Sequence, residues 1–260
     1  MTQKYGMGYS QTFIDVLRKR CVKTHAQFLI PYLKPGMKIL DCGCGPGSMT
    51  IDFARYVPHG EAVGVDIEGR QIAIATADAK RENVTNVTFQ TADVFDLPFA
   101  DDTFDLVFSQ GLLVHLPDPI QALQEQKRVT KKGGMVTARS GCVPGAVFHP
   151  ENALLKEAWL FHNQPLLDQC VGIKLEEMFS SAGLQDIKHS LLCDISRDQE
   201  LANFFADEVI NRDYSQKLLA QGKITLEKLQ AYRDAWLNHA KTPHALFGQM
   251  IGEAIGCKNC

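Results

Sequence analysis

The sequence lacks any long uninterrupted run of apolar residues, although 45% of its 260 residues are hydrophobic. A membrane-spanning helix needs roughly 18 or more consecutive apolar residues. The first ten residues, MTQKYGMGYS, also lack the apolar core of a secretory signal. We therefore expect a cytoplasmic protein without a membrane span, and the chain is long enough to bury a full hydrophobic core.

The sequence also lacks a large excess of positively or negatively charged residues. The chain has 27 Lys and Arg against 30 Asp and Glu, which gives a formal net charge of −3. A near-neutral, slightly acidic protein has no overall field that would gather nucleic acid. We therefore expect no nucleic-acid partner.

The eight cysteines are scattered rather than arranged as a disulfide framework. Cys42 and Cys44 lie in a glycine-rich turn, where reduced thiols are the expected state in a cytosolic protein. Cys257 and Cys260 form a CxxC at the end of the sequence, but no second ligand pair accompanies it. The sequence therefore predicts no metal site.

The first half of the chain alternates short apolar runs with helical patterns. Strands are expected at residues 37–40, 61–67, 87–93, 104–110 and 135–139, and helices at 48–56, 69–82 and 118–130. A helical stretch, 10–33, precedes them. Strands and helices that alternate in this way form right-handed βαβ units around a parallel sheet. The pattern predicts an α/β fold of the Rossmann-like type.

The pattern changes after Gly141. Two helical pieces are expected in residues 151–182, a sixth strand at 184–195, charged helices at 198–240 and a last strand at 244–256. We interpret this part as completion of the sheet with a helical insertion. The predicted organisation is an N-terminal helical cap, 1–34, followed by one domain, 35–260, with its insertion at about 198–240.

A glycine-rich loop follows the first expected strand. Its spacing, Gly43-x-Gly45-x-Gly47, differs from the dinucleotide fingerprint G-x-G-x-x-G, whose third glycine position is taken by Ser48. Glycine suits backbone with positive φ or a close ligand. Asp41 precedes the loop, and a carboxylate there would disfavour a pyrophosphate but suit an ammonium group.

Two more acids end the next expected strands. Asp66 is suited to a ribose diol, and Asp93 to the exocyclic amine of an aminopurine. Taken alone, each carboxylate could instead cap a helix or form a turn. Together with Asp41 they describe a ligand with an amine, a diol and an aminopurine but no phosphate, which matches S-adenosylmethionine.

The sequence resembles the class I S-adenosylmethionine-dependent methyltransferases, in particular the small-molecule group related to the ubiquinone and menaquinone biosynthesis enzymes. The matching motifs are ILDCGCGPGS (39–48), GVDI (64–67), TADVFDLPFADDTFDLVFS (91–109), HLPDP (115–119) and VTKKGG (129–134). The resemblance implies a seven-stranded, mostly parallel sheet with an antiparallel last strand and helices on both faces. It also implies S-adenosylmethionine as the cofactor.

The resemblance assigns the cofactor contacts to Asp41, Gly43, Gly45, Gly47, Asp66, Ile67, Asp93, Val94, Ser109 and Gln110. The first four would hold the methionine portion, the next two the ribose and adenine, and the following two the adenine edge. The last two would lie near the transferred methyl group. One departure is Ser140, where related sequences often have an acid.

Methyl transfer from a sulfonium is an in-line displacement that mainly requires alignment, with a base only for a protonated nucleophile. His115, at the rim of the expected cleft, is the candidate base, or else it orders its loop. Tyr5 and Tyr9 could fold over the cofactor or belong to a frayed terminus. Arg139 could bind an acidic substrate group or form an internal ion pair. His25 is expected on the surface.

The sequence thus predicts an enzyme that transfers a methyl group from S-adenosylmethionine to oxygen, nitrogen, sulfur or carbon of a small, partly apolar acceptor. The main alternative keeps the cofactor but catalyses a cyclisation or rearrangement without methyl transfer, because fold does not fix function. A nicotinamide-dependent oxidoreductase is disfavoured by the glycine spacing and Asp41. A non-catalytic binding protein is the remaining possibility, and no pattern indicates an oligomeric state.

Overall fold

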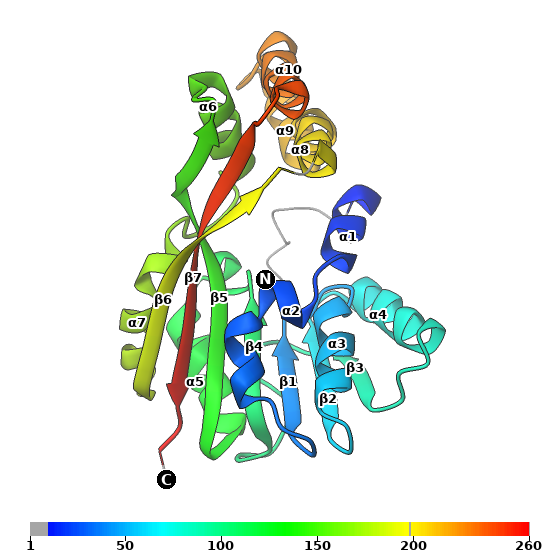
Figure 1. The fold of residues 1–260 in the computed structure, drawn as a ribbon, viewed down its shortest axis with the longest axis vertical. Helices are drawn as coiled ribbons and strands as arrows, with labels where there is room; N and C mark the ends of the chain where they lie inside the picture. The colour runs from blue at the N-terminus through cyan, green and yellow to red at the C-terminus, as the bar shows by residue number, and fades with distance from the viewer. Residues whose placement is uncertain (1–9, 198, 260) are drawn as a thin grey trace.

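A computed structural model describes residues 10–197 and 199–259. It contains one seven-stranded sheet with helices on both faces and a group of helices beyond one end of the sheet (Figure 1). The strands are β1 (Lys38–Cys42), β2 (Glu61–Asp66), β3 (Val87–Thr91), β4 (Phe104–Gln110), β5 (Thr130–His149), β6 (Gln185–Ser196) and β7 (Leu246–Cys257). The helices are α1 (Gln11–Arg18), α2 (Val22–His25), η1 (Gln27–Tyr32), α3 (Ser48–Tyr56), α4 (Gly69–Arg81), η2 (Leu113–His115), α5 (Pro119–Val129), α6 (Ala153–His162), α7 (Val171–Ser181), α8 (Gln199–Asn211), α9 (Asp213–Ala220) and α10 (Leu226–Lys241).

The strand order is β3-β2-β1-β4-β5-β7-β6. Neighbouring strands from β3 to β5 are parallel, whereas β7 is antiparallel to both β5 and β6. The predicted mostly parallel sheet with an antiparallel last strand is therefore confirmed. Because the strands β1, β2 and β4 are parallel, their carboxyl ends meet at one edge, and the chain order reverses between β1 and β4 at that edge.

The fifth strand is much longer than its predicted core at 135–139. It continues to His149 because β7 supplies an antiparallel partner, with Val147 opposite Gly248 and a register shift after Cys142. Pro144, at this irregularity, cannot donate a backbone hydrogen bond. The extension of β5, β6 and β7 carries the group of helices seen at the top of Figure 1.

The predicted helical stretch at 10–33 is divided into three short helices, α1, α2 and η1. Ser10 caps α1 by accepting the backbone N–H of Phe13, and Pro31 lies inside the 3-10 helix η1. On the sheet face, Val22 and Leu29 are fully buried against residues of β1 and α3. These segments therefore cover part of the sheet.

Aromatic residues that follow β5 form the core of the helical group. Trp159, Phe205, Trp236 and Phe247 pack together with ring centroids 4.7–5.9 Å apart. Because Trp159 lies on α6, this core joins α6 to α8 and α10. Burial of such large rings is the main stabilisation of the helical group.

In the described parts of the chain, no helix is both long enough and apolar enough to cross a membrane.

Candidate functional site

The glycine loop connects β1 to α3 and uses left-handed backbone at each glycine. The φ angles of Gly43, Gly45 and Gly47 are 71°, 53° and 79°. A Cβ atom at Gly47 would lie 2.6 Å from Ala75 and 2.8 Å from Phe89. Glycine is therefore required at this position both by conformation and by space.

Asp41, the last residue but one of β1, is buried just before this loop. Its carboxylate accepts a hydrogen bond of 2.6 Å from the Thr50 hydroxyl. Burial raises the pKa of Asp41 to about 7, with smaller effects from the Thr50 bond and the charge of Asp66. No Lys or Arg within residues 10–197 and 199–259 forms an ion pair with it. A positively charged ligand in the adjoining cleft would therefore stabilise the carboxylate, so Asp41 fits the sulfonium compound that the sequence predicts.

Asp66 ties the glycine loop to the start of α4. Its carboxylate accepts the backbone N–H groups of Gly45 and Glu68, both at 2.9 Å. Burial raises the pKa of Asp66, and these hydrogen bonds counteract the effect. The next residue, Ile67, keeps 53% of its surface exposed. An apolar side chain left open beside a carboxylate is suited to an aromatic base next to a ribose.

Asp93 lies two residues beyond the end of β3 and is exposed. Its carboxylate accepts the backbone N–H of Phe95 at 3.0 Å, while Val94 between them is buried. The turn-forming role, one of the two interpretations of this acid, is thus observed. Its contact to an adenine stays a prediction.

The carboxyl end of β4 carries buried polar atoms that have no hydrogen-bond partner among the described residues. They are Ser109 Oγ and Gln110 Oε1, and Ser140 Oγ on the neighbouring β5 shares this property. Buried polar groups of this kind are costly unless a ligand or water satisfies them. Leu112, just beyond, would lie 3.0 Å from a Cβ at Gly43, so the loop after β4 contacts the glycine loop.

His115 ends η2 and is largely enclosed. Burial lowers its pKa to about 4, and the positive charge of Arg212, between α8 and α9, acts in the same direction. The backbone N–H groups of Leu167 and Asp168 donate to the Val114 carbonyl and hold this segment in place. His115 is therefore neutral at physiological pH, the form that a general base requires.

Arg139 lies at the position in β5 opposite Gln110, and its side chain is only 6% exposed. Its guanidinium pairs with Asp194 of β6 at 2.8 Å and with Glu253 of β7 at 3.2 Å. The interpretation as an internal ion pair therefore describes this residue. Tyr5 and Tyr9 lie outside the described residues.

The expectation that His25 is an ordinary surface residue holds only in part, because its side chain is half-buried. Burial lowers its pKa to about 4, and the charges of Arg20, Arg139 and Asp194 also act on it. The reason is that α2 packs on the sheet, where its neighbour Val22 is fully buried. A four-residue helix gives too short a pattern to show this from sequence.

The sequence did not indicate that α1 lies over the glycine loop. Ser48 donates to the Leu17 carbonyl at 2.8 Å, and Arg18 binds both carboxylate oxygens of Asp78 at 2.8 and 3.1 Å. At the other end of α1, Ser10 donates to Glu208 of α8 at 2.6 Å. Helix α1 thus links the loop, α4 and the helical group (Figure 1).

Gln71 is a second residue that sequence reasoning missed. It is 1% exposed, and both atoms of its amide group lack a partner among the described residues. It lies one helical turn before Ala75, which contacts the glycine loop, so it belongs to the same face of α4. A polar residue on an otherwise small and buried helix face was the available signal.

The sequence matches the family described as methyltransferase domain over residues 33–208. It is 36% identical over 153 residues to an uncharacterised methyltransferase of Schizosaccharomyces pombe, covering 56% of this chain and 55% of that protein. It is also 36% identical over 121 residues to a demethylmenaquinone methyltransferase of Staphylococcus carnosus, covering 46% and 47%. The chain thus spans about half the length of the curated relatives it matches.

Among solved structures, the YcgJ protein of Bacillus subtilis superimposes with a TM-score of 0.64. The match covers 90% of this chain and 97% of that one at 21% sequence identity. At this identity the likeness establishes the fold, and it agrees with the predicted Rossmann-like architecture.

Proposed function

Because this chain belongs to the methyltransferase-domain family, we propose that it transfers a methyl group from S-adenosylmethionine to a small-molecule acceptor. Membership of this family confirms the resemblance that the sequence motifs indicated. The cofactor is S-adenosylmethionine. The observation that carries the proposal is Asp41, a buried carboxylate without a basic partner in the described chain, directly before three left-handed glycines.

The cofactor, when bound, supplies a methyl group on a positively charged sulfur, which is an activated donor. We assign its methionine portion to Asp41 and to the backbone of Gly43, Gly45 and Gly47. Asp66 and Ile67 would hold the ribose and the adenine, and the loop of Asp93 and Val94 would meet the adenine edge. This set supplies carboxylates and apolar surface but no phosphate-binding side chain.

We assign the alignment of the methyl donor and the acceptor to the carboxyl end of β4. Ser109 and Gln110 bring buried polar atoms to the sheet edge where no protein partner meets them. Such atoms can orient a donor and an acceptor at no further desolvation cost, since they are already withdrawn from water. The adjacent loop, through Leu112, closes against Gly43 and excludes water from the same point.

His115 is proposed as the general base for an acceptor whose nucleophile carries a proton. Its imidazole is neutral at physiological pH, so one ring nitrogen can accept that proton. Its short 3-10 helix directly follows the β4 end that carries Ser109 and Gln110.

The acceptor is proposed to be small and partly apolar. One relative of this chain is named a demethylmenaquinone methyltransferase, which supports the inclusion of quinol acceptors among the candidates. We further propose that residues 1–34 act as a cap, with Tyr5 and Tyr9 on the acceptor side, and that residues 35–260 form the catalytic domain with its insertion at about 198–240. Arg139, held between two carboxylates, would shape the acceptor wall rather than bind an anion.

The experiment is incubation of the purified protein with S-adenosylmethionine carrying a deuterated methyl group and a panel of phenolic, quinol and amine acceptors. Mass spectrometry should detect S-adenosylhomocysteine and an acceptor that has gained the labelled methyl group. Asp66→Asn serves as the control and should abolish most of the signal. Conversion of an acceptor without formation of S-adenosylhomocysteine would instead identify a cyclase or an isomerase.

A further inference from the structure

Strand β6 forms an open edge of the sheet. Among the described residues it pairs on one side, with β7, and it is the last strand in the sheet order (Figure 1). It runs for 12 residues, about twice the usual length of a strand. It contains no proline, and its irregularity against β7 lies near its start, between Gln185 and Lys188. A long regular edge presents backbone N–H and C=O groups that favour pairing with another strand.

One side of this strand carries apolar side chains that are open to solvent. Leu191 and Ile195 keep 52% and 53% of their surface exposed. Leu191 lies opposite Gly252, where a Cβ would strike the backbone of α7, so Leu191 faces the side of the sheet on which α7 packs. Ile195 lies opposite Gly248, whose other neighbour in the sheet is Val147, also 52% exposed. Exposed apolar side chains that gather in this way mark an interaction surface.

A second copy of β6 can pair with this edge only in certain registers. When two copies of one strand pair antiparallel about a two-fold axis, residues equally far before and after the axis face each other. Because side chains alternate between the faces, the axis must pass through one residue, and the apolar side of one copy then adjoins that of the other. The regular part of the edge, residues 187–195, is centred on Leu191.

An axis at Leu191 also matches charges. It sets Lys188 of each copy opposite Asp194 of the other, so the pair of strands contains this contact twice. Opposite charges that face each other across neighbouring strands stabilise the pairing, and like charges oppose it. Moving the axis one residue earlier would set Asp194 opposite Asp186, and moving it one residue later would set it opposite Ser190. The charges therefore favour the same register as the centre of the edge.

Both charged groups are within reach of a second copy. Lys188 is exposed and donates to the Tyr32 hydroxyl at 3.0 Å. The Asp194 side chain is 48% exposed, although one of its oxygens accepts a hydrogen bond from Arg139. A carboxylate has two oxygens and can accept several hydrogen bonds, so Asp194 retains the capacity to bind a second cation.

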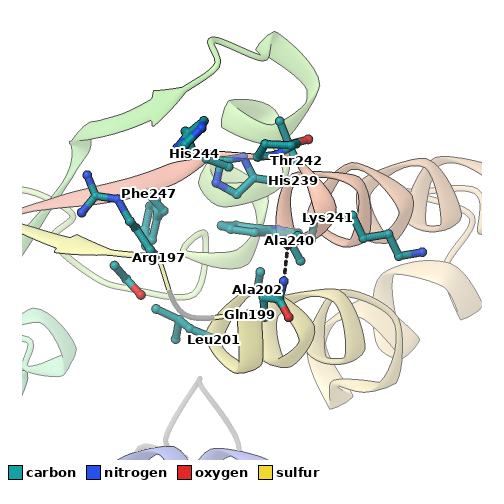
Figure 2. Close-up of a pocket in the computed structure, with 14 residues that line it drawn as sticks. Arg197, Gln199, Leu201, Ala202, His239, Ala240, Lys241, Thr242, His244 and Phe247 are labelled. Carbon is teal, nitrogen blue, oxygen red and sulfur yellow. Dashed lines mark hydrogen bonds between the residues drawn. The ribbon is translucent and has the colours of Figure 1, made fainter.

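The two ends of the strand fit this overlap. At its start, Asp186 has left-handed backbone, with a φ of 49°, within the irregularity that ends the regular edge. Past its other end the chain enters α8, where Gln199 donates to the Ala240 carbonyl of α10 at 3.0 Å (Figure 2). With the axis at Leu191, the strand of each copy begins where the helical group of the other begins. The regular edge is therefore paired throughout, and neither strand has to run past the other's helices.

We propose that two copies of this chain associate along β6, antiparallel and with the two-fold axis at Leu191, so that their sheets join into one. Leu191 then faces its counterpart, and Ile195 faces Ile187 of the second copy. Lys188 faces Asp194 of the second copy on the other side of the joined sheet. This assembly does not depend on the proposed methyl transfer.

The first test is sedimentation velocity of the full chain over a series of concentrations. The parent should be mainly dimeric at about 50 µM. Leu191→Lys should raise the dissociation constant of the dimer at least about a hundredfold, because two like charges would meet at the axis. Leu226→Lys, at a similarly exposed leucine on α10, should leave it unchanged. Both variants should bind S-adenosylmethionine as the parent does, which checks that they are folded.

Cysteine cross-linking tests the register. Two cysteines directly opposite each other in neighbouring strands lie close enough to form a disulfide. Under mild oxidation by diamide, Leu191→Cys in a chain that also carries Cys193→Ser should give a covalent dimer, and Cys193→Ser alone should not. In the parent, the exposed Cys193 faces His189 of the second copy rather than its own counterpart, so cross-linking should be at least about tenfold slower.

Three results would overturn the proposal. The first is a parent chain that sediments as a monomer at about 100 µM. The second is a Leu191→Lys variant that dimerises as the parent does. The third is cross-linking of the parent through Cys193 as fast as that of the Leu191→Cys variant, which would place the axis elsewhere on the strand.

Discussion

Thr50 donates its hydroxyl hydrogen to the carboxylate of Asp41 across 2.6 Å, and both residues are buried. This single neutral partner does not offset the burial of the charge, so the pKa of Asp41 rises to about 7. The folded chain therefore binds a proton more tightly than the unfolded chain does. The contribution of Asp41 to stability is present below its unfolded pKa and is lost as pH rises toward 7.

The first prediction concerns Asp41→Asn, which keeps the shape of the side chain and removes the charge. At pH 8 the ligand-free variant should be more stable than the parent, by roughly 1–4 kcal/mol, and it should bind S-adenosylmethionine more weakly. Chemical denaturation at pH 4 and pH 8 measures the first effect, which should be close to zero at pH 4, near the unfolded pKa of an aspartate. A variant that is less stable at pH 8 would show that the charge has a partner in the folded protein.

The second prediction compares two glycines with similar φ but different surroundings. Gly47→Ala should cost about 2–4 kcal/mol of stability, because its new methyl group would strike Ala75 and Phe89 as well as strain the backbone. Gly222→Ala, at φ 66° with nothing within 4 Å, should cost only about 1 kcal/mol. Thermal or urea unfolding of both variants measures the difference, and equal costs would remove the steric argument for the loop.

The third prediction is a pH profile that depends on His115. Because its pKa in the folded protein is about 4, the imidazole stays neutral well below its ordinary pKa. If His115 is the base, the turnover rate should stay constant as pH is lowered to about 5 and should fall only below that pH. His115→Gln should lower turnover by about 10²–10⁴-fold with little change in cofactor affinity. An acid limb near the ordinary histidine pKa, or a parent-like rate in the variant, would rule this role out.

The same shift has a stability consequence of the opposite sign to that of Asp41. A histidine whose folded pKa is lowered contributes stability above its unfolded pKa, and that contribution is lost as pH falls toward 4. Differential scanning calorimetry of the parent and of His115→Gln between pH 4 and pH 7 should show the parent losing more stability on acidification.

The fourth prediction tests the charge cluster at the β5 edge. Arg139→Gln should destabilise the protein by about 1–3 kcal/mol, because buried Glu253 loses its cation while half-exposed Asp194 is partly compensated by water. Burial already raises the pKa of Glu253, and Arg139 opposes that rise, so the loss should grow as pH increases. The double variant Arg139→Gln with Glu253→Gln should recover part of the stability in urea unfolding. No recovery would place the cost in packing rather than in charge.

Local patterns predicted the parallel half of the fold well. The ends of α3 and β4 agree with the predicted residues because glycine, proline and turn signals flank both segments closely in the sequence. The length of β5 was missed, because Pro144 and its neighbouring glycines weaken the strand pattern and the antiparallel partner, β7, comes about a hundred residues later.

In the candidate site, too, some features could be predicted from local sequence and others depend on tertiary packing. The glycine loop and Asp66 follow from spacing alone, since a strand that turns into a helix fixes their relative positions. The contact of Arg18 with Asp78 and the burial of Gln71 depend on how separate elements pack, which no local pattern encodes. Packing also decided that Arg139 is held by two carboxylates.

The most direct test of a cleft built for a positively charged nucleoside is calorimetric titration of the purified chain with S-adenosylmethionine and, separately, with NAD. At pH 7, in two buffers of different ionisation enthalpy, we predict that S-adenosylmethionine binds with release of protons, because its charge favours the ionised form of Asp41. NAD should give no measurable heat of binding. Binding of NAD, or no binding of S-adenosylmethionine to the folded protein, would contradict the assignment.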